Sequence, residues 1–233
     1  MAINHEMNYY NYGKTLSAEG IMMPLPTNGN KGKHEYVDLG LPSGLKWATC
    51  NIGALSPEEN GLYFAWGETS GYTAEQVGVD KNFTWDDYSM TSDGGETFDK
   101  YNDDDGLRTL EPEDDAATVN WGEDWRMPTT DEFEELLENT TSSWTEVNGV
   151  SGMLLTSNVE GHEEETLFFP AVGNADDGQV YGIGIDGDYL SASLGHKGVS
   201  NANRLSFHSG QCEVHVNDRY YGYAVRPVCS QNL

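Results

Sequence analysis

Short β-forming stretches separated by turn residues fill the second half of the chain, and this pattern constrains the fold more than any other feature. The stretches lie near residues 152–156, 166–171, 179–185, 203–208, 212–217 and 223–228. Each is shorter than a typical helix, and Gly, Asn, Asp or Ser residues bound it. We therefore expect a region of short antiparallel strands, and it contains no internal repeat.

Two of these stretches alternate between apolar and polar residues. Successive side chains of a strand point to opposite faces of the sheet, and Ser209-Gly210 between the two stretches has the composition of a turn. We therefore expect the apolar members to share one buried face. These are Leu205, Phe207, Val214 and Val216.

The opposite side of these two strands, continued by the tyrosines that follow them, is a candidate ligand-binding face. Its members are Arg204, Ser206, His208, Glu213, His215, Asn217, Tyr221 and Tyr223. A solvated sheet face shows the same alternation. The tyrosines favour binding, because rigid amphipathic rings beside adaptable polar groups are typical of surfaces that recognise ligands.

One clear helix signal follows Pro128. Thr129 and Glu132 have the spacing of a capping box, and apolar residues follow them at helical spacing, namely Phe133, Leu136 and Leu137. A weaker signal predicts a one-turn helix that begins at Ser56-Pro57. Further signals predict short strands at residues 36–39, 45–49 and 62–66. A few helices beside many short strands predict the α+β class.

The first 34 residues lack a sustained helix or strand period. Pro24, Pro26 and the turn-forming stretch at residues 28–32 interrupt them. We predict an arm or attachment segment at residues 1–34 and one domain at residues 35–233, while a disordered terminus fits the same sequence equally well. No basic and apolar leader is visible, so no secretory signal is expected.

The chain is strongly acidic, with 39 Asp and Glu against 12 Lys and Arg and a formal net charge of −27. A surface this negative repels phosphate and argues against nucleic acid as a partner, and no apolar run approaches the roughly 20 residues needed to cross a bilayer. Residues 93–138 hold 17 of the acids, which we interpret as solvation of the domain body. The candidate face is expected to be less acidic, because its tyrosines have basic neighbours in Arg204, His208, His215 and Arg219.

The acidic run at residues 102–106 resembles a calcium-binding loop without meeting its requirements. An EF-hand needs oxygen ligands at positions 1, 3, 5 and 12 of the loop and Gly at position 6. With Gly106 at position 6, Tyr101 and Pro112 would occupy positions 1 and 12. The EF-hand is thus excluded, and an irregular calcium site stays open.

Two further motifs lack the context that their chemistry requires. Residues 182–187 match G-x-G-x-x-G, but the helical pattern that a dinucleotide site demands does not follow. His208, Cys212 and His215 have neither a fourth ligand nor the spacing of a zinc site. We therefore expect no metal site and no cofactor.

Several distinctive motifs are spread along the domain. In chain order they are YVDLGLPSG at 36–44, WATCNIGA at 47–54, YFAWGET at 63–69, DDAA at 114–117, WRMPT at 125–129 and GYAVRPV at 222–228. In this order they resemble the major paralogous domain family of gut bacteria and their phages. The resemblance covers about residues 35–229.

The resemblance implies a C-type-lectin-like fold with short antiparallel strands, one or two helices and long irregular loops, related to the fold of the formylglycine-generating enzyme. The same fold carries the variable proteins of diversity-generating retroelements, whose ligand-binding segment corresponds here to about residues 189–223. Family members often have Tyr-Trp-Ser-Ser near the start of that segment, whereas this chain has Tyr189-Leu190-Ser191-Ala192-Ser193. Either the binding face or the core packing has diverged there.

Formylglycine-generating activity is not expected, because that chemistry needs two cysteines close together in the active site. Cys212 and Cys229 lie on different predicted strands, and Cys50 is distant in the sequence. We expect buried free thiols, since a disulfide between Cys50 and Cys229 would require adjacent terminal strands. No catalytic residue is expected.

Together, these features predict a non-enzymatic ligand-binding protein, which would be a receptor-binding or adhesion protein on a phage virion or another extracellular surface. Its ligand would be a cell-surface carbohydrate or protein. The arm at residues 1–34 would attach the domain to other virion proteins or support a homo-oligomer, and membrane insertion is not expected. The alternative is a structural virion decoration or fibre component that binds only its own assembly.

Overall fold

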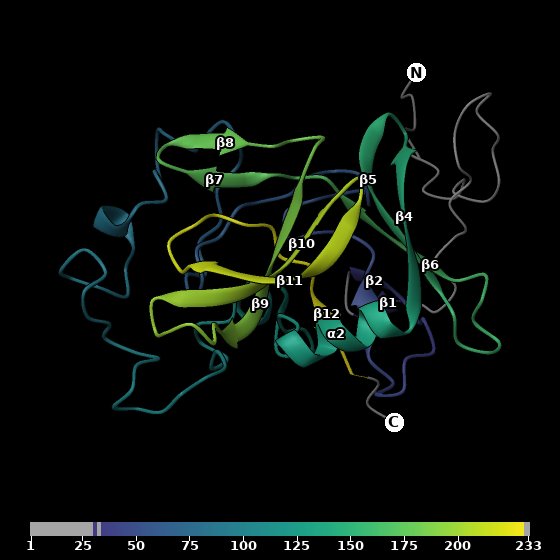
Figure 1. The fold of residues 1–233 in the computed structure, drawn as a ribbon, viewed down its shortest axis with the longest axis horizontal. Helices are drawn as coiled ribbons and strands as arrows, with labels where there is room; N and C mark the ends of the chain where they lie inside the picture. The colour runs from purple at the N-terminus through teal and green to yellow at the C-terminus, as the bar shows by residue number, and fades with distance from the viewer. Residues whose placement is uncertain (1–29, 32–33, 231–233) are drawn as a thin grey trace, which may run out of the picture.

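The computed structural model describes residues 30–31 and 34–230 of the 233-residue chain (Figure 1). The helices among them are the 3-10 helix η1 (Trp85–Asp87), α1 (Ala116–Trp121) and α2 (Thr130–Glu138). The strands are β1 (Asn30–Lys31), β2 (His34–Val37), β3 (Lys46–Ala48), β4 (Thr140–Val147), β5 (Val150–Ser157), β6 (Thr166–Pro170), β7 (Asn174–Asp176), β8 (Gln179–Tyr181), β9 (Gly187–Leu194), β10 (Asn201–His208), β11 (Gln211–Asp218) and β12 (Val228–Cys229). The predicted arm lies outside the described residues, apart from β1 and the first residue of β2. The turn predicted at residues 28–32 is therefore wrong where β1 forms.

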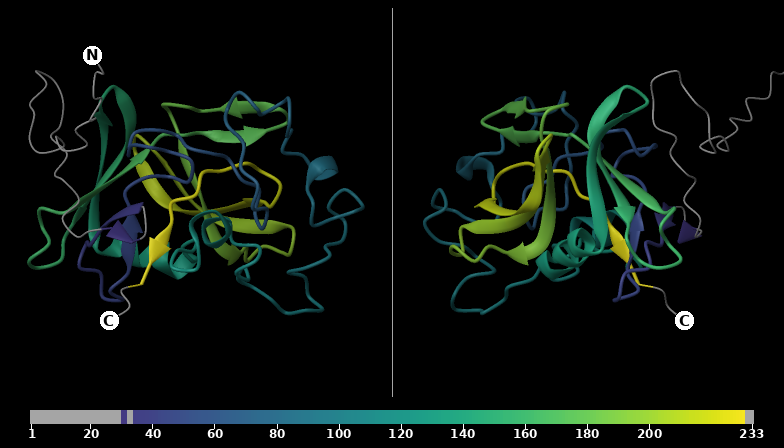
Figure 2. Two further views of the ribbon diagram at one scale, coloured as in Figure 1. Left: turned by 180° about the vertical axis from the view of Figure 1, so that it is seen from behind. Right: turned by 45° about the vertical axis from the view of Figure 1, so that its right-hand side comes forward.

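The strands of the described part of the chain form four small antiparallel sheets. Their orders are β1-β2-β3-β12, β11-β10-β9, β4-β5-β6 and β7-β8. In the first sheet β3 pairs with β12, so segments from opposite ends of the domain lie side by side (Figure 2). Many short antiparallel strands with few helices confirm the predicted α+β class. No helix within the described residues is long and apolar enough to span a bilayer.

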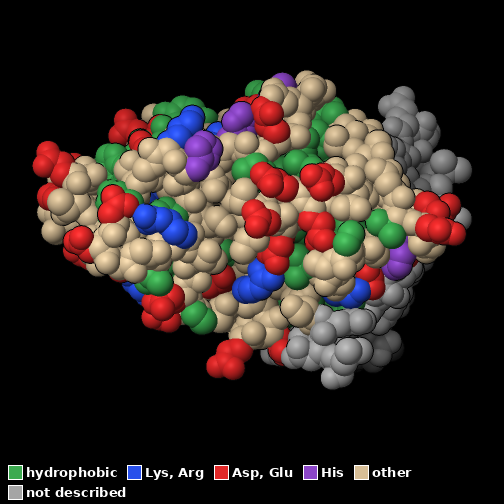
Figure 3. Space-filling model, turned by 60° about the horizontal axis from the view of Figure 1, so that its bottom comes forward, with side chains coloured by type: hydrophobic (Ala, Val, Ile, Leu, Met, Phe, Trp, Pro, Cys, Tyr) green, Lys and Arg blue, Asp and Glu red, His purple; other side chains and the backbone are tan. Residues whose placement is uncertain are grey.

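The acidic segment at residues 93–138 is mostly irregular, and most of its acidic residues are exposed. Figure 3 shows acidic side chains spread over the face seen from the α2 side, with fewer basic side chains among them. Lys100 offsets some of this charge by pairing with Glu111 and Asp114, each at 2.6 Å. Asp115 is the one acid of this segment that is buried, because it caps α1.

Helix α2 forms where its capping signal predicts. The Thr129 hydroxyl accepts a hydrogen bond from the Glu132 N–H at 3.3 Å, and the Glu132 carboxylate accepts one from the Thr129 N–H at 2.8 Å. This reciprocal pair satisfies two N–H groups that the first turn leaves free. Phe133 and Leu136 are fully buried, and the helix lies below both larger three-stranded sheets in Figure 1.

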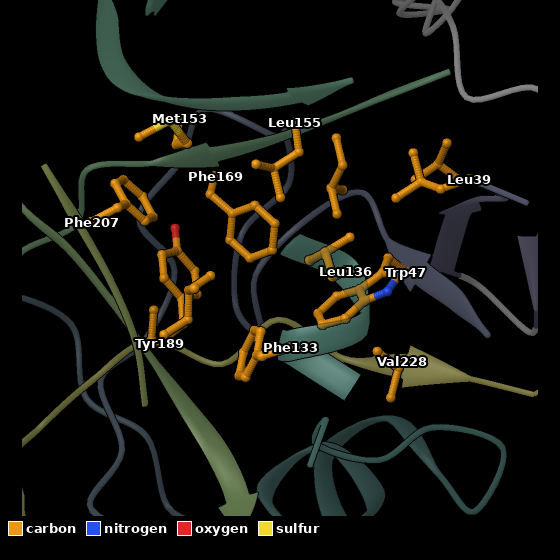
Figure 4. Packing of buried hydrophobic residues seen from close by; sticks show 14 of the residues in the cluster. Leu39, Trp47, Phe133, Leu136, Met153, Leu155, Phe169, Tyr189, Phe207 and Val228 are labelled. Atoms are coloured by element: carbon orange, nitrogen blue, oxygen red, sulfur yellow. The ribbon is translucent and has the colours of Figure 1, made fainter. Parts of the chain in front are cut away.

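The main core lies between α2 and the inner faces of those sheets (Figure 4). The ring of Phe133 lies 5.4 Å from that of Trp47, and the ring of Phe169 lies 4.9 Å from that of Tyr189. Full burial of each such ring stabilises the fold by about 1.5–3 kcal/mol. The core therefore fixes where β9 and β10 lie relative to α2.

The C-terminal segment at residues 222–226 runs beside β9 and is mostly not a regular strand. The Leu190 N–H donates to the Ala224 carbonyl at 2.9 Å, and the Ala224 N–H donates to the Asp188 carbonyl at 3.3 Å. The strand predicted at residues 223–228 is therefore reduced to β12, with single bridges before it. This course brings the preceding tyrosines beside the β9–β11 sheet.

Three other local predictions are wrong or only partly right. The helix predicted to begin at Ser56-Pro57 is instead a turn, closed by one hydrogen bond from the Glu59 N–H to the Ser56 carbonyl at 3.2 Å. Fixing the backbone of a first helical turn costs more conformational entropy than a single hydrogen bond offsets. The strand predicted at residues 62–66 consists of single-residue bridges. The strand predicted at residues 179–185 ends at Tyr181, because the glycines that follow adopt a left-handed backbone.

Candidate ligand-binding face

The predicted apolar side of β10 and β11 faces the main core. Leu205 and Phe207 are each 1% exposed, and Val214 packs against the same cluster. Val216 is only half-buried, because it lies near the end of the edge strand. The alternation predicted from the sequence is confirmed for the other three residues.

The polar residues of the two strands share the opposite side of the sheet. Their register pairs are Arg204 with His215, Ser206 with Glu213, His208 with Gln211 and Ala202 with Asn217. The structure thus brings the six predicted polar residues of β10 and β11 together. Strand β9 continues this side with Asp188, which pairs with Ser206.

Arg204 is held in place from two directions. Its Nε donates to the Asp188 carboxylate at 2.7 Å, and its guanidinium lies 5.2 Å from the centre of the Tyr223 ring. The Asn217 amide donates to the Tyr223 hydroxyl at 2.8 Å. Tyr223 is only 2% exposed, and burial raises the pKa of its hydroxyl. It therefore lies beneath the face and supports it from below, whereas the prediction placed it among the residues that contact a ligand.

The tyrosines after β11 form a stack that ends at the sheet. The ring centres of Tyr220 and Tyr221 lie 4.6 Å apart, and those of Tyr221 and Tyr223 lie 5.9 Å apart. Trp85 contacts Tyr220 edge-on at 4.8 Å. Tyr220 and Tyr221 are half-buried, so they present part of their surface to solvent from a fixed position.

Strand β7 fixes the path of the tyrosine stack. The Ala175 N–H donates to the Gly222 carbonyl at 2.8 Å, and the Gly222 N–H donates back to the Ala175 carbonyl at 2.9 Å. A Cβ at Gly222 would lie 2.8 Å from the Ala175 Cβ and 2.7 Å from the Phe83 ring, so only glycine permits this approach. Because Ala175 and Gly222 pair in an antiparallel bridge, their chain neighbours Asp176 and Tyr221 lie close together.

A cavity of about 400 Å³ lies between α2 and the side of the β9–β11 sheet that faces it, with Ser193, Asn203 and Val214 in its wall. Pockets of this size accept small molecules or single groups of larger ligands. His215 forms part of its wall and pairs with Glu213 at 2.7 Å, with 47% of the His215 and 44% of the Glu213 side chain exposed. Other lining residues are Arg108, Thr130, Asp131 and His196.

Arg219 does not lie on the candidate face, contrary to the prediction. It is 0% exposed, and its guanidinium lies 4.4 Å from the Phe98 ring centre and 4.8 Å from that of Trp66. It donates to the Tyr88 hydroxyl at 3.0 Å and the Val199 carbonyl at 2.8 Å. Burial lowers its pKa. The predicted basic character of the face is therefore weaker than the sequence suggests.

The chemistry available to the cysteines is limited in the described residues. Cys50, Cys212 and Cys229 form no disulfide there, although β3 and β12 are adjacent. Burial raises the pKa of the Cys212 thiol to about 12, so it is protonated at neutral pH and a poor nucleophile. Cys212 packs toward the core, away from His208 and His215. Within residues 30–31 and 34–230, no three His, Cys, Asp or Glu side chains are placed to hold a metal ion.

Four residues near the face escaped the sequence prediction, namely Trp85, Asp176, Asp188 and Tyr220. Asp188 belongs to a strand that is buried on both faces, and Asp176 belongs to a strand of only 3 residues, so neither had a pattern in the sequence that assigned it to a face. Tyr220 directly precedes a predicted residue, and a longer aromatic run at residues 220–223 was the signal that could have included it.

No family model, curated protein or solved structure matches this chain. Its own residues and their geometry therefore carry the functional argument.

Proposed function

We propose that this chain is a non-enzymatic ligand-binding protein with a C-type-lectin-like fold. It would serve as a receptor-binding or adhesion protein on a phage virion or another extracellular surface. The sequence motifs that resemble the major paralogous domain family support this fold, as do the small antiparallel sheets, the two short α-helices and the long irregular loops.

One observation carries the proposal more than any other. The polar residues predicted from alternation lie on one side of the β9–β11 sheet, with half-buried tyrosines beside them and with His215 also lining a cavity. Adaptable polar groups beside rigid aromatic rings are typical of surfaces that recognise ligands. The ligand would be a carbohydrate or a protein on a cell surface.

The residues of the candidate face divide into a supporting and a contacting group. Arg204, Asn217 and Tyr223 are held by hydrogen bonds and ring contacts beneath the surface. The contacting group is at least partly exposed throughout and comprises Ser206, His208, Glu213, His215 and Tyr221. Preorganisation of this kind lowers the entropy lost on binding.

Binding of the fluorescently labelled full chain to a glycan array and to a panel of intact bacterial strains tests the proposal. We expect at least one strain or glycan class to bind, and we expect Glu213→Ala/His215→Ala to weaken that binding about tenfold or more. The matched control is His34→Ala/Glu35→Ala, which removes the same two residue types from β2 and should change binding less than twofold.

Treatment of the bound strain with protease, or with periodate, would then assign the receptor to protein or carbohydrate. A protein that binds no strain and no glycan, yet is incorporated into particles, would contradict the proposal. That outcome would support the alternative, a structural virion component.

A further inference from the structure

Two carboxylates flank the exposed tyrosines without any cation to balance them. We call this region the tyrosine surface, and it consists of Trp85, Asp176, Asp218, Tyr220 and Tyr221. Asp176 lies next to Tyr221 because Ala175 and Gly222 pair in an antiparallel bridge, and Asp218 accepts a hydrogen bond from the Asn201 amide at 2.7 Å. Burial raises the pKa of the Tyr220 hydroxyl, and the negative charges of Asp176 and Asp218 add to this effect. Neither forms a salt bridge within the described residues.

The basic residues that the sequence places nearby are already engaged. Arg204 is paired with Asp188, with only 16% of the Arg204 side chain exposed. Arg219 is enclosed by aromatic rings and carbonyls. Burial raises the pKa of both Asp176 and Asp218, as expected for half-buried carboxylates that lack a counter-ion. The surface that remains is acidic and aromatic.

Ring stacking determines which parts of the tyrosines a partner can touch. Tyr221 stacks on Tyr220 and on Tyr223, with interplanar angles of 24° and 7°. These two stacks take up ring surface of Tyr221 on which a sugar ring could otherwise stack.

An extended aliphatic chain that ends in a cation fits this surface better. Lysine and arginine side chains lay their methylene stems along apolar surface and keep the charged end at polar groups. Ring edges would contact the stem, and the Asp176 and Asp218 carboxylates would accept charge-assisted hydrogen bonds from the ammonium or guanidinium. The net charge of −27 would also draw such a partner in from a distance.

We infer that the tyrosine surface binds a lysine- or arginine-bearing segment of a protein partner. This inference rests on the proposed function, and it selects protein over carbohydrate as the ligand at this end of the candidate face.

Titration of the full chain with three labelled peptides of equal length tests the inference. One peptide alternates Lys with Gly, the second replaces each Lys by Gln, and the third replaces each Lys by Glu. We expect only the Lys peptide to bind. We expect Asp176→Asn/Asp218→Asn to weaken the binding of this peptide about tenfold or more. Both substitutions keep the size of the side chain, and Asp218→Asn keeps an oxygen that can accept the hydrogen bond from Asn201. The fold should therefore be retained, which the Tm would verify.

The control variant Asp103→Asn/Asp104→Asn makes the same charge change at two exposed positions in the acidic loop. It should weaken binding of the Lys peptide less than twofold. An equal loss in both variants would show attraction by net charge alone and would overturn the inference, as would unchanged binding in Asp176→Asn/Asp218→Asn.

The same two variants in the cell-binding assay separate this inference from the proposed function. Suppose that the wild type binds cells in a way that a soluble glycan competes away, and that Asp176→Asn/Asp218→Asn binds the cells equally well. In that case the inference fails while the proposed function stands. If the Lys peptide binds at the tyrosine surface but no cell binds, the proposed function fails.

Discussion

Three arginines near the C-terminus are largely buried, and each is held by a different set of partners. Arg204 pairs with a carboxylate, Arg219 lies among aromatic rings and carbonyls, and Arg226 donates to the carbonyls of Ala48 and Phe168. A buried charge costs several kcal/mol unless hydrogen bonds compensate it. These side chains therefore hold the segments that build the candidate face, and they are not free to bind a ligand.

The burial of Arg219 could not be predicted from the sequence. Its neighbours Asp218 and Tyr220 indicate an exposed polar stretch, whereas the groups that enclose it come from positions such as Trp66 and Tyr88, more than a hundred residues away. A local sequence pattern can assign a residue to one face of a strand. A contact between residues this far apart in the sequence depends on the whole fold.

Replacement of Arg219 by methionine should lower the free energy of unfolding by about 3 kcal/mol. The Val199 carbonyl and the Tyr88 hydroxyl would lose their donor in a buried site. Urea unfolding measures the change. The control Arg108→Met removes an arginine whose side chain is 52% exposed and should cost less than about 1 kcal/mol. Equal losses in the two variants would refute the structural role.

At the scale of elements, predictions held where the signal is local. Helix α2 carries its own cap and apolar face, and β10 and β11 carry their own alternation, with Leu205 and Phe207 buried. Strand β9 gave no such signal, because seven of its eight residues are buried and both of its faces are covered. Sequence alone could thus predict two strands of the candidate face and not the third, which contributes Asp188.

The short helix α1 depends on a single buried carboxylate. Asp115 accepts hydrogen bonds from the N–H groups of Ala117 at 2.8 Å, Thr118 at 2.9 Å and Met127 at 2.9 Å. Asp115→Ala should lower the free energy of unfolding by about 2 kcal/mol, since the cap and a buried acceptor are both lost. The exposed Glu123→Ala, measured beside it in urea, should have no comparable effect.

The effect of Asp115→Ala should also depend on pH. Burial raises the pKa of Asp115 in the folded protein above its value of about 3.8, so the folded state favours the protonated form. The stabilisation from this shift is complete below the unfolded pKa and is lost as pH rises through the folded pKa. The difference between wild type and Asp115→Ala should therefore shrink as pH rises through that window. A difference that grows with pH would contradict the assigned burial effect.

At the scale of the whole molecule, the negative charge and the binding face are separate features. Most acids of residues 93–138 are exposed on irregular loops, where they solvate the body. The candidate face lies on the β9–β11 sheet, and its two ends differ in chemistry. Strand β11 offers His215, which also lines the cavity, while the tyrosine surface offers tyrosines beside two carboxylates whose pKa burial raises.

The most direct test of the candidate face is the affinity of the full chain for the bacterial strain that binds it best. We predict that His215→Ala/Tyr221→Ala, which alters both ends of the face, raises the Kd at least about tenfold. The matched control His34→Ala/Tyr36→Ala removes the same residue types from β2 and should leave the Kd within twofold, with both variants folded by their unfolding curves. An unchanged Kd in His215→Ala/Tyr221→Ala, or an equal rise in the control, would contradict the assignment of ligand binding to this face.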